Sequence, residues 1–329
     1  MNMKYYGIAD ISAVLSVLIV LYYIYGRKHK PTISDKYCSK LPDNMTPGEV
    51  NAFIHKNSTD SDAMASSILN LSTEGYIKFE TTAIKGSFLN KGKIDIKILP
   101  RKNYEHLRDY DVLLMDFLNG ILNSGYTIKD YCTYNGAACL DFIKEYKKCI
   151  KHSIKSSHKE YYEKPHKEAV SILLVISALN VLWTALSLIS RNFKVLLYSI
   201  PCFLISLCGI LLFERMSIQG VNSLYMWKAF RNYLKNISSM EKDDMPEVSV
   251  LEKYIAYAVA LGVCKPVLKE LPSSYAEAKE GYYSTWFDCC GYFEPIEDYD
   301  KIYEFIHALC SCCNMIFHSK TSQQKDAGM

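Results

Sequence analysis

Two long apolar runs, separated by only five residues, dominate the hydropathy pattern of the chain. Residues 169–189 and 195–213 contain no charged side chain, and SRNFK, residues 190–194, stands between them. Each run approaches the roughly 20 residues with which a helix crosses about 30 Å of hydrocarbon. Because a helix satisfies its own backbone hydrogen bonds in lipid, the pattern predicts a transmembrane hairpin with a tight turn. The alternative is a buried helical hairpin in a soluble core.

A third apolar run covers residues 8–26 and ends in the basic sequence GRKHK. A cleaved signal peptide has small residues after its apolar core, so the bulky and basic ending favours an uncleaved anchor. Arg27, Lys28 and Lys30 exceed the basic groups before the run, which predicts an amino terminus outside and residue 27 onward in the cytoplasm. The hairpin then returns the chain to the cytoplasm. We therefore expect a mainly α-helical, multi-pass protein of the cell membrane with three transmembrane helices.

Alternating and helical periods predict a small α+β module after the first span. Thr46-Pro47-Gly48-Glu49 is a capping-box pattern with proline at the first helical position. It predicts a helix at 47–55, followed by a second helix from Ser61 that ends at Gly75. Two strands follow at 76–80 and 93–99, the second with strict alternation in KIDIKIL. Two helices and a hairpin are the layout of a winged-helix-like module in the cytoplasm.

The rest of the chain reads mostly as helix, with predicted helices at 104–122, 136–163, 221–237, 250–261 and 300–318 and an amphipathic period in the third of these. A stretch rich in Tyr, Asp and Glu at 281–300 reads as loop. The complete predicted order is a short outside amino terminus (1–7), transmembrane helix (8–26), linker (27–44), winged-helix-like module (45–100), cytoplasmic helical segment (101–168), transmembrane helix (169–189), turn (190–194), transmembrane helix (195–213), cytoplasmic helical region (214–318) and disordered tail (319–329).

Twelve cysteines raise the question of a metal site or a disulfide framework. In the predicted cytoplasmic location thiols stay reduced. Zinc sites need pairs of thiolates about two residues apart on turns, which Cys289-Cys290 and Cys310-Ser-Cys312-Cys313 do not provide. The nucleotide-binding glycine loops and the zinc-protease motif are also missing from the sequence. We therefore expect no catalytic residue, no cofactor and no metal ligand, and a protein that is not an enzyme.

The remaining function classes are separated by charge. The helix from Ser61 to Gly75, which would read DNA in a winged-helix protein, contains acidic residues and no Lys or Arg. Phosphate contacts need the opposite charge, so nucleic acid is not the expected partner. The aromatic composition of the amphipathic helices suits protein interfaces, which favours a scaffold or signalling adaptor that binds a cytoplasmic protein or a second copy. The candidate interaction surface consists of Trp227, Phe230, Arg231, Tyr233, Tyr254 and Tyr257.

Three other functions stay open at this stage. The main alternative to a scaffold is a membrane-tethered winged-helix regulator that binds DNA. A transporter is disfavoured because neither span of the hairpin contains a charged residue. An enzyme with an unrecognised site is the third possibility.

Several stretches resemble one known family. LPDNMTPGEV (41–50), LNLSTEGYIKFE (69–80) and LEKYIAYAVALGV (251–263), arranged around a two-helix hairpin, are similar to the YciQ-like predicted bacterial membrane proteins, which carry domain of unknown function 2207. The segment from Gly220 to Leu234, with Trp227 and Phe230, also resembles the part of that family that follows the hairpin. Family members usually have a large extracytoplasmic β domain before the first span, whereas about seven residues precede it here. The resemblance implies an architecture without assigning an activity.

Overall fold

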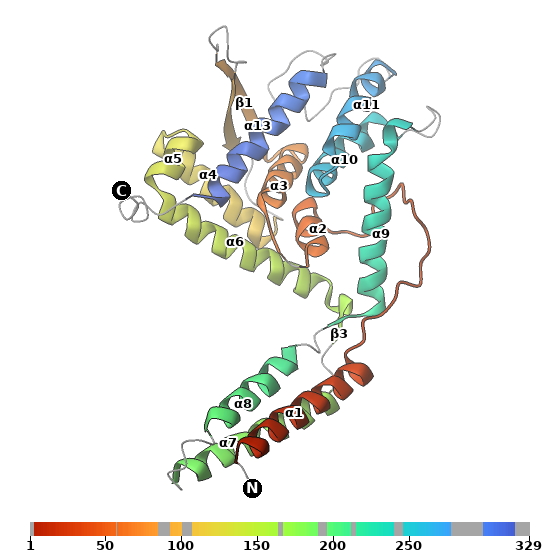
Figure 1. Ribbon diagram of the computed structural model, residues 1–329. Helices are drawn as coiled ribbons and strands as arrows, with labels where there is room; N and C mark the ends of the chain where they lie inside the picture. Colours follow the sequence, from red (N-terminus) through yellow and green to blue (C-terminus); the bar gives the residue numbers. More distant parts are fainter. Residues whose placement is uncertain are drawn as a thin grey trace. The chain divides into compact units, whose positions relative to one another are not determined.

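The chain forms two compact units in the computed structural model (Figure 1). Unit 1 contains residues Met1–Ser34 and His158–Asn222, and unit 2 contains Asp35–Ser157 and Ser223–Met329. The structure describes residues 3–56, 58–84, 93–100, 107–163, 167–189, 196–211, 215–239, 246–277 and 299–319. The predicted turn at 190–194 lies outside these residues, as do almost all of the predicted loop at 281–300 and of the tail at 319–329.

Unit 1 is built from three apolar helices. They are α1 (Met3–Tyr25), α7 (Lys167–Ile189) and α8 (Leu196–Leu211), and α8 packs against both of the others. Leu21 of α1 meets Ala169 and Leu173 of α7 in a small buried cluster. A Cβ atom at Gly209 would overlap the Leu18 side chain, so α8 and α1 approach closely at this glycine.

Most large apolar side chains of these helices face outward. Examples are Ile19 on α1, Leu179 and Trp183 on α7, and Leu197 on α8, all more than half exposed. A water-soluble surface rarely presents contiguous apolar patches of this kind. Among the described residues, one helical stretch, Lys167–Leu186, is long and apolar enough to cross a membrane, and shorter apolar stretches lie at Ile11–Tyr25 and Ser199–Gly209.

Unit 2 begins with two helices and a hairpin. They are α2 (Pro47–Ile54), α3 (Ser61–Thr73), β1 (Ile77–Ile84) and β2 (Lys93–Pro100). The strands pair antiparallel, with Phe79 opposite Ile98. Three helices follow before unit 1 intervenes: α4 (Asp109–Ser124), α5 (Ile128–Tyr134) and α6 (Gly136–Ser157).

The later part of unit 2 completes the core around α3. It contains most of α9 (Ile218–Lys235), and then η2 (Ile237–Ser239), α10 (Val248–Ala260), α11 (Cys264–Glu277) and α13 (Tyr299–Phe317). Helix α3 packs against α2, α10 and α13 and is buried along most of its length. The Asn51 side chain on α2 donates to the backbone carbonyl of Ala260 on α10 at 3.0 Å. The two segments of unit 2, before and after residues 158–222, therefore form one core.

Local signals placed most of the element ends correctly. The capping box of Thr46 and Glu49 is present at the start of α2, and Gly75, Gly125 and Gly262 follow their helices with φ of 77°, 70° and 66°. These left-handed conformations favour glycine.

Two helix predictions were wrong in extent, and one helix was missed. Helix α4 begins at Asp109 instead of residue 104, because Arg108 is its extended N-cap. The separate helix α5 was missed, although Thr127 caps it by accepting from the Asp130 amide. Helix α6 ends at Ser157 instead of residue 163, where a short 3-10 turn, η1 (Lys159–Tyr161), takes over.

Candidate functional site

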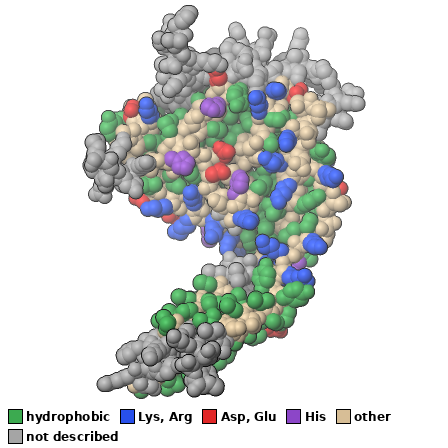
Figure 2. All heavy atoms as spheres, in the orientation of Figure 1, with side chains coloured by type: hydrophobic (Ala, Val, Ile, Leu, Met, Phe, Trp, Pro, Cys, Tyr) green, Lys and Arg blue, Asp and Glu red, His purple; other side chains and the backbone are tan. Residues whose placement is uncertain are grey.

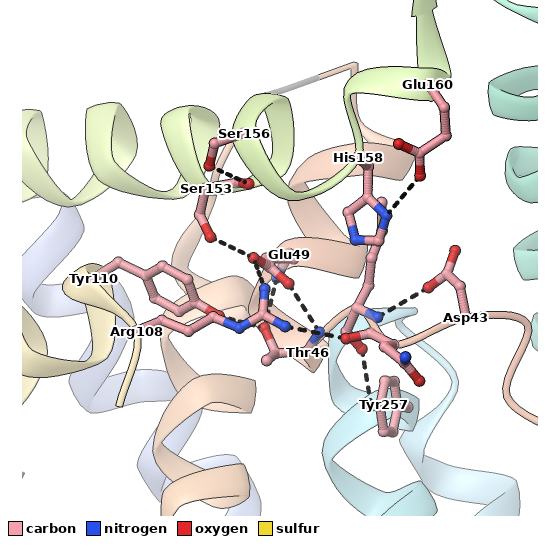
Figure 3. Close-up of polar contacts among 12 residues, drawn as sticks. Asp43, Thr46, Glu49, Arg108, Tyr110, Ser153, Ser156, His158, Glu160 and Tyr257 are labelled. Atoms are coloured by element: carbon pink, nitrogen blue, oxygen red, sulfur yellow. Dashed lines mark hydrogen bonds and ion pairs between the residues drawn. The ribbon is translucent and has the colours of Figure 1, made fainter. Parts of the chain in front are cut away.

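A buried carboxylate at the start of α2 is the centre of a polar cluster in unit 2 (Figure 3). The side chain of Glu49 is completely buried. One of its oxygens, Oε2, accepts from the Thr46 backbone amide at 3.0 Å, which is the side-chain half of the capping box. This arrangement follows from the local sequence, because Glu49 stands three residues after the N-cap.

The other oxygen of Glu49 is held by residues from distant parts of unit 2. The Arg108 guanidinium forms an ion pair with Oε1, and the Ser153 hydroxyl of α6 donates to the same oxygen at 2.7 Å. Arg108 also donates to the backbone carbonyl of Asn44 at 3.1 Å. Both carboxylate oxygens therefore accept hydrogen bonds, and the cluster joins the starts of α2 and α4 to α6.

Two tyrosines and an aspartate surround this ion pair. The Tyr110 hydroxyl lies 2.5 Å from the Thr46 hydroxyl, and the Tyr146 hydroxyl lies 3.1 Å from that of Ser67. Burial raises the pKa of both tyrosines. Burial, followed by the charges of two glutamates, also raises the pKa of Asp111 well above its ordinary value. Burial therefore favours the neutral forms of these three side chains, and they lie around the Glu49 carboxylate, whose charge is balanced by Arg108.

A second cluster of hydrogen bonds holds the segment before α2. The Asp43 carboxylate accepts from the Ser223 hydroxyl at 2.7 Å, from Trp227 Nε1 at 3.1 Å and from the Met45 amide at 2.9 Å. The Tyr257 hydroxyl donates to the Met45 carbonyl at 2.9 Å. These bonds attach the segment between Asp35 and Met45 to α9 and α10.

This attachment explains where the predicted interaction residues lie. Trp227 and Phe230 are completely buried, and Tyr233, Tyr254 and Tyr257 are at most 9% exposed. The rings pack on one another between α9 and α10. Of the six residues, only Arg231 is exposed, and its Nε donates to the Leu261 carbonyl at 2.8 Å. In this structure the aromatic side chains of the predicted surface form an internal core, because the chain's own 35–45 segment and α10 cover them.

Unit 1 has its own polar cluster, where the ends of its apolar helices meet. The Glu163 carboxylate accepts from Arg215 Nε at 2.6 Å and lies 2.9 Å from His29 Nε2. Arg215 also donates to the Tyr25 carbonyl at 3.0 Å, and the Tyr25 hydroxyl donates to Glu168 at 2.7 Å. Burial alone would raise the pKa of Glu163, but the hydrogen bond and charge of Arg215 outweigh it and hold that pKa below its ordinary value. The cluster joins the residues after α1 to those before α7 and after α8.

Two of the cysteines form a close thiol pair. Cys132 and Cys139 have their sulfurs 4.0 Å apart, and this hydrogen bond lowers the pKa of Cys139 to about 7 while it raises that of Cys132. Burial raises the pKa of Cys264 and Cys313. No group of three or more potential metal ligands occurs within the described ranges. Cys289 and Cys290 lie outside those ranges.

Sequence reasoning found the Thr46–Glu49 half of the main cluster and missed the rest. Arg108 and Ser153 are 59 and 104 residues from Glu49. No local pattern marks such pairs. In the sequence, the one sign that Glu49 is buried is its position among apolar and small residues at the start of the helix.

Comparison with known proteins gives a family and no activity. No curated protein and no solved structure matches the chain. Residues 34–271 match the family described as the C-terminal domain of predicted membrane protein DUF2207. The match begins just before the segment that bonds to α9 and α10, and it includes the Glu49 cluster and the apolar hairpin. The chain therefore belongs to the DUF2207 family of predicted membrane proteins.

Proposed function

We propose that the chain is a non-enzymatic membrane scaffold with three transmembrane helices, whose unit 2 lies in the cytoplasm and binds a protein partner. The observation that supports the membrane topology is that unit 2 is built from two segments that lie on either side of α7 and α8 in the sequence. Residues Asp35–Ser157 and Ser223–Met329 form one compact unit, so both segments lie on the same side of a membrane. The intervening residues must then cross an even number of times. If α7 crosses, α8 must cross back.

The outward apolar faces of α1 and α8 support crossings by these helices as well. A single crossing by α1 places the amino terminus on the side opposite unit 2. The basic residues Arg27, Lys28 and Lys30 favour the cytoplasm for unit 2.

Accessibility of single cysteines tests this topology. In a variant without other cysteines, Thr133→Cys on exposed α5 should resist an impermeant maleimide in intact cells and react after permeabilisation. Arg191→Cys, in the predicted turn, should react in intact cells. Labelling of Thr133→Cys in intact cells would contradict the cytoplasmic location, and protection of Arg191→Cys would contradict the hairpin.

The scaffold role rests on how the polar groups of unit 2 are used. Both oxygens of the buried Glu49 carboxylate accept hydrogen bonds from the chain itself, which supports a role in stability. The order of α2, α3, β1 and β2 supports a winged-helix-like module. DNA reading by α3 is disfavoured, because α3 is buried against other helices and its exposed ends carry Asp60 and Glu74.

An exposed tyrosine pair is the best candidate for the protein-binding surface. Tyr126, just before α5, and Tyr134, its last residue, are 48% and 71% exposed. Their ring centroids are 5.6 Å apart. Tyrosine is enriched at binding hot spots because it offers a large rigid face with one polar group.

A photo-crosslinking amino acid at position 134 tests this surface in living cells. We expect one discrete adduct, with a second copy or with another protein, that is lost in the Tyr126→Ser variant. The same crosslinker at exposed Asp141 serves as the control. Equal labelling from both positions, or no adduct from position 134, would refute the protein-binding role of this pair.

A further inference from the structure

The exposed face of α6 carries a row of lysines. The row, here called the lysine face, consists of Lys144, Lys147, Lys148, Lys151 and Lys155. At 100° per residue these positions fall within an arc of about 100° on the helix. All five side chains are exposed, and basic side chains gather along α6 in the space-filling view (Figure 2).

The opposite side of α6 is fixed in the core of unit 2. Phe142, Tyr146, Ile150 and Ile154 are buried. The helix therefore cannot rotate its lysines inward, and the direction of the lysine face is set by packing.

Two acids of α6 itself pair with lysines of this face. Asp141 lies 3.3 Å from Lys144, and Glu145 lies 3.4 Å from Lys148. Both pairs are between side chains more than half exposed, and such pairs contribute little and exchange readily with other ions. Lys147 also lies over the Phe317 ring, 5.2 Å from its centroid. Because the five lysines outnumber the two acids of α6, the face has a net positive charge that favours an anionic surface.

We propose that the lysine face binds the anionic headgroups of the bilayer that α7 enters. The lysines alone would also suit a nucleic acid. Chain connectivity favours the lipid, since only nine residues separate the end of α6 at Ser157 from the start of α7 at Lys167. These residues span at most about 35 Å when extended. The same chain that inserts α7 therefore holds the lysine face near a membrane surface at a high effective concentration.

The physical basis is the surface potential of an anionic leaflet. Each lysine near such a surface gains about a fivefold preference for it. This attraction falls off within a Debye length of about 8 Å at physiological salt. Five lysines on one helical face can approach a flat surface together, whereas the scattered lysines of the other helices cannot.

Lysine footprinting of the full chain in nanodiscs tests the proposal, which rests on the proposed membrane insertion. The chain is reconstituted in phosphatidylcholine alone or with added phosphatidylglycerol, and acylation of each lysine is followed by mass spectrometry. We expect the lysine face to react about fivefold more slowly in the anionic discs and to recover in high salt. The exposed Lys56, Lys129, Lys228 and Lys235 of unit 2 are internal controls and should not change.

Two matched triple variants separate the face from overall charge. Lys147→Gln/Lys148→Gln/Lys151→Gln should abolish the protection of the two remaining lysines of the face. The control, Lys56→Gln/Lys129→Gln/Lys228→Gln, removes the same charge elsewhere and should preserve it.

The other outcomes overturn the proposal in distinguishable ways. Equal acylation in both kinds of disc, with the chain incorporated in each, would refute the lysine face and leave the membrane insertion standing. Protection by single-stranded RNA in neutral discs, without protection by phosphatidylglycerol, would assign the face to nucleic acid. A chain that enters neither kind of disc would refute the insertion and the lysine face together.

Discussion

Removing the Arg108 side chain should destabilise unit 2 far more than removing an ordinary surface charge. Arg108 is 31% exposed, but its partner Glu49 is completely buried. In an Arg108→Gln variant the Ser153 hydroxyl and the Thr46 amide remain as donors to that carboxylate, while its opposite charge is lost. Breaking a buried ion pair costs about 3–5 kcal/mol, and the partial exposure of Arg108 reduces this to about 2–3 kcal/mol.

Thermal unfolding of the full chain in detergent measures this loss. One kcal/mol lowers Tm by about 2–4 °C in a domain the size of unit 2, so Arg108→Gln should lower it by about 5–10 °C. Glu49→Gln should cost less, about 1–2 kcal/mol, because glutamine keeps the capping position but brings an amide nitrogen among donors. The double variant should cost at least about 1 kcal/mol less than the sum of the single variants, since neither charge is then left alone.

Lys144→Gln is the matched control. It breaks the exposed pair with Asp141 and should change stability by less than about 0.5 kcal/mol. If Arg108→Gln behaves like this control, or if the two single effects simply add, the reasoning that the Glu49 cluster locks α2 and α4 onto α6 is refuted.

Three further outcomes are expected from unfolding measurements. Gly48→Ala should destabilise unit 2 by about 1–3 kcal/mol, because the new Cβ would overlap a side chain of α3. The control Gly120→Ala, with open space around it, should be neutral or stabilise by up to about 1 kcal/mol, and equal effects of the two variants would contradict the close α2–α3 packing. The raised pKa of Asp111 means that the folded state holds the Asp111 proton more tightly than the unfolded state does. The contribution of Asp111 to stability therefore falls as pH rises above the ordinary aspartate pKa. Asp111→Asn should raise Tm at pH 8 and have little effect near pH 4, and a larger gain at pH 4 than at pH 8 would be inconsistent with this burial. Because the pKa of Glu163 is lowered, its ionised form stabilises unit 1 above the ordinary glutamate pKa, and this stability is lost in acid. Arg215→Gln should therefore make stability less dependent on pH on the acid side, and an unchanged pH dependence would count against the ion pair.

Features coded by neighbouring residues were predictable from the sequence. The start of α2 and the ends of α3, α4 and α10 depend on a capping box and on glycines, which act within one helical turn. The apolar runs of α7 and α8 were equally visible because hydropathy needs no knowledge of partners. The start of α4 was misplaced because apolar periodicity continues upstream of Arg108, and the period alone does not mark an N-cap.

Features that depend on distant partners were not predictable. The aromatic stripe around Trp227 and Phe230 was interpreted as an interaction surface, but the pattern does not say whether a partner or the same chain covers such a face. Here the 35–45 segment does so through Asp43, which bonds to Ser223 and Trp227, 180 and 184 residues further along the chain. The ion pair of Glu49 with Arg108 was hidden for the same reason.

The discontinuous core of unit 2 has a consequence for biosynthesis. Helix α3 leaves the ribosome long before α10, which packs against it, and the interval at ordinary elongation rates is on the order of ten to forty seconds. During this time the amino-terminal half of unit 2 exposes apolar surface that only the later half can cover. A hairpin that inserted with a single crossing would strand α10 on the wrong side and leave α3 uncovered. Under the proposed topology, completion of unit 2 therefore depends on the second crossing of the hairpin.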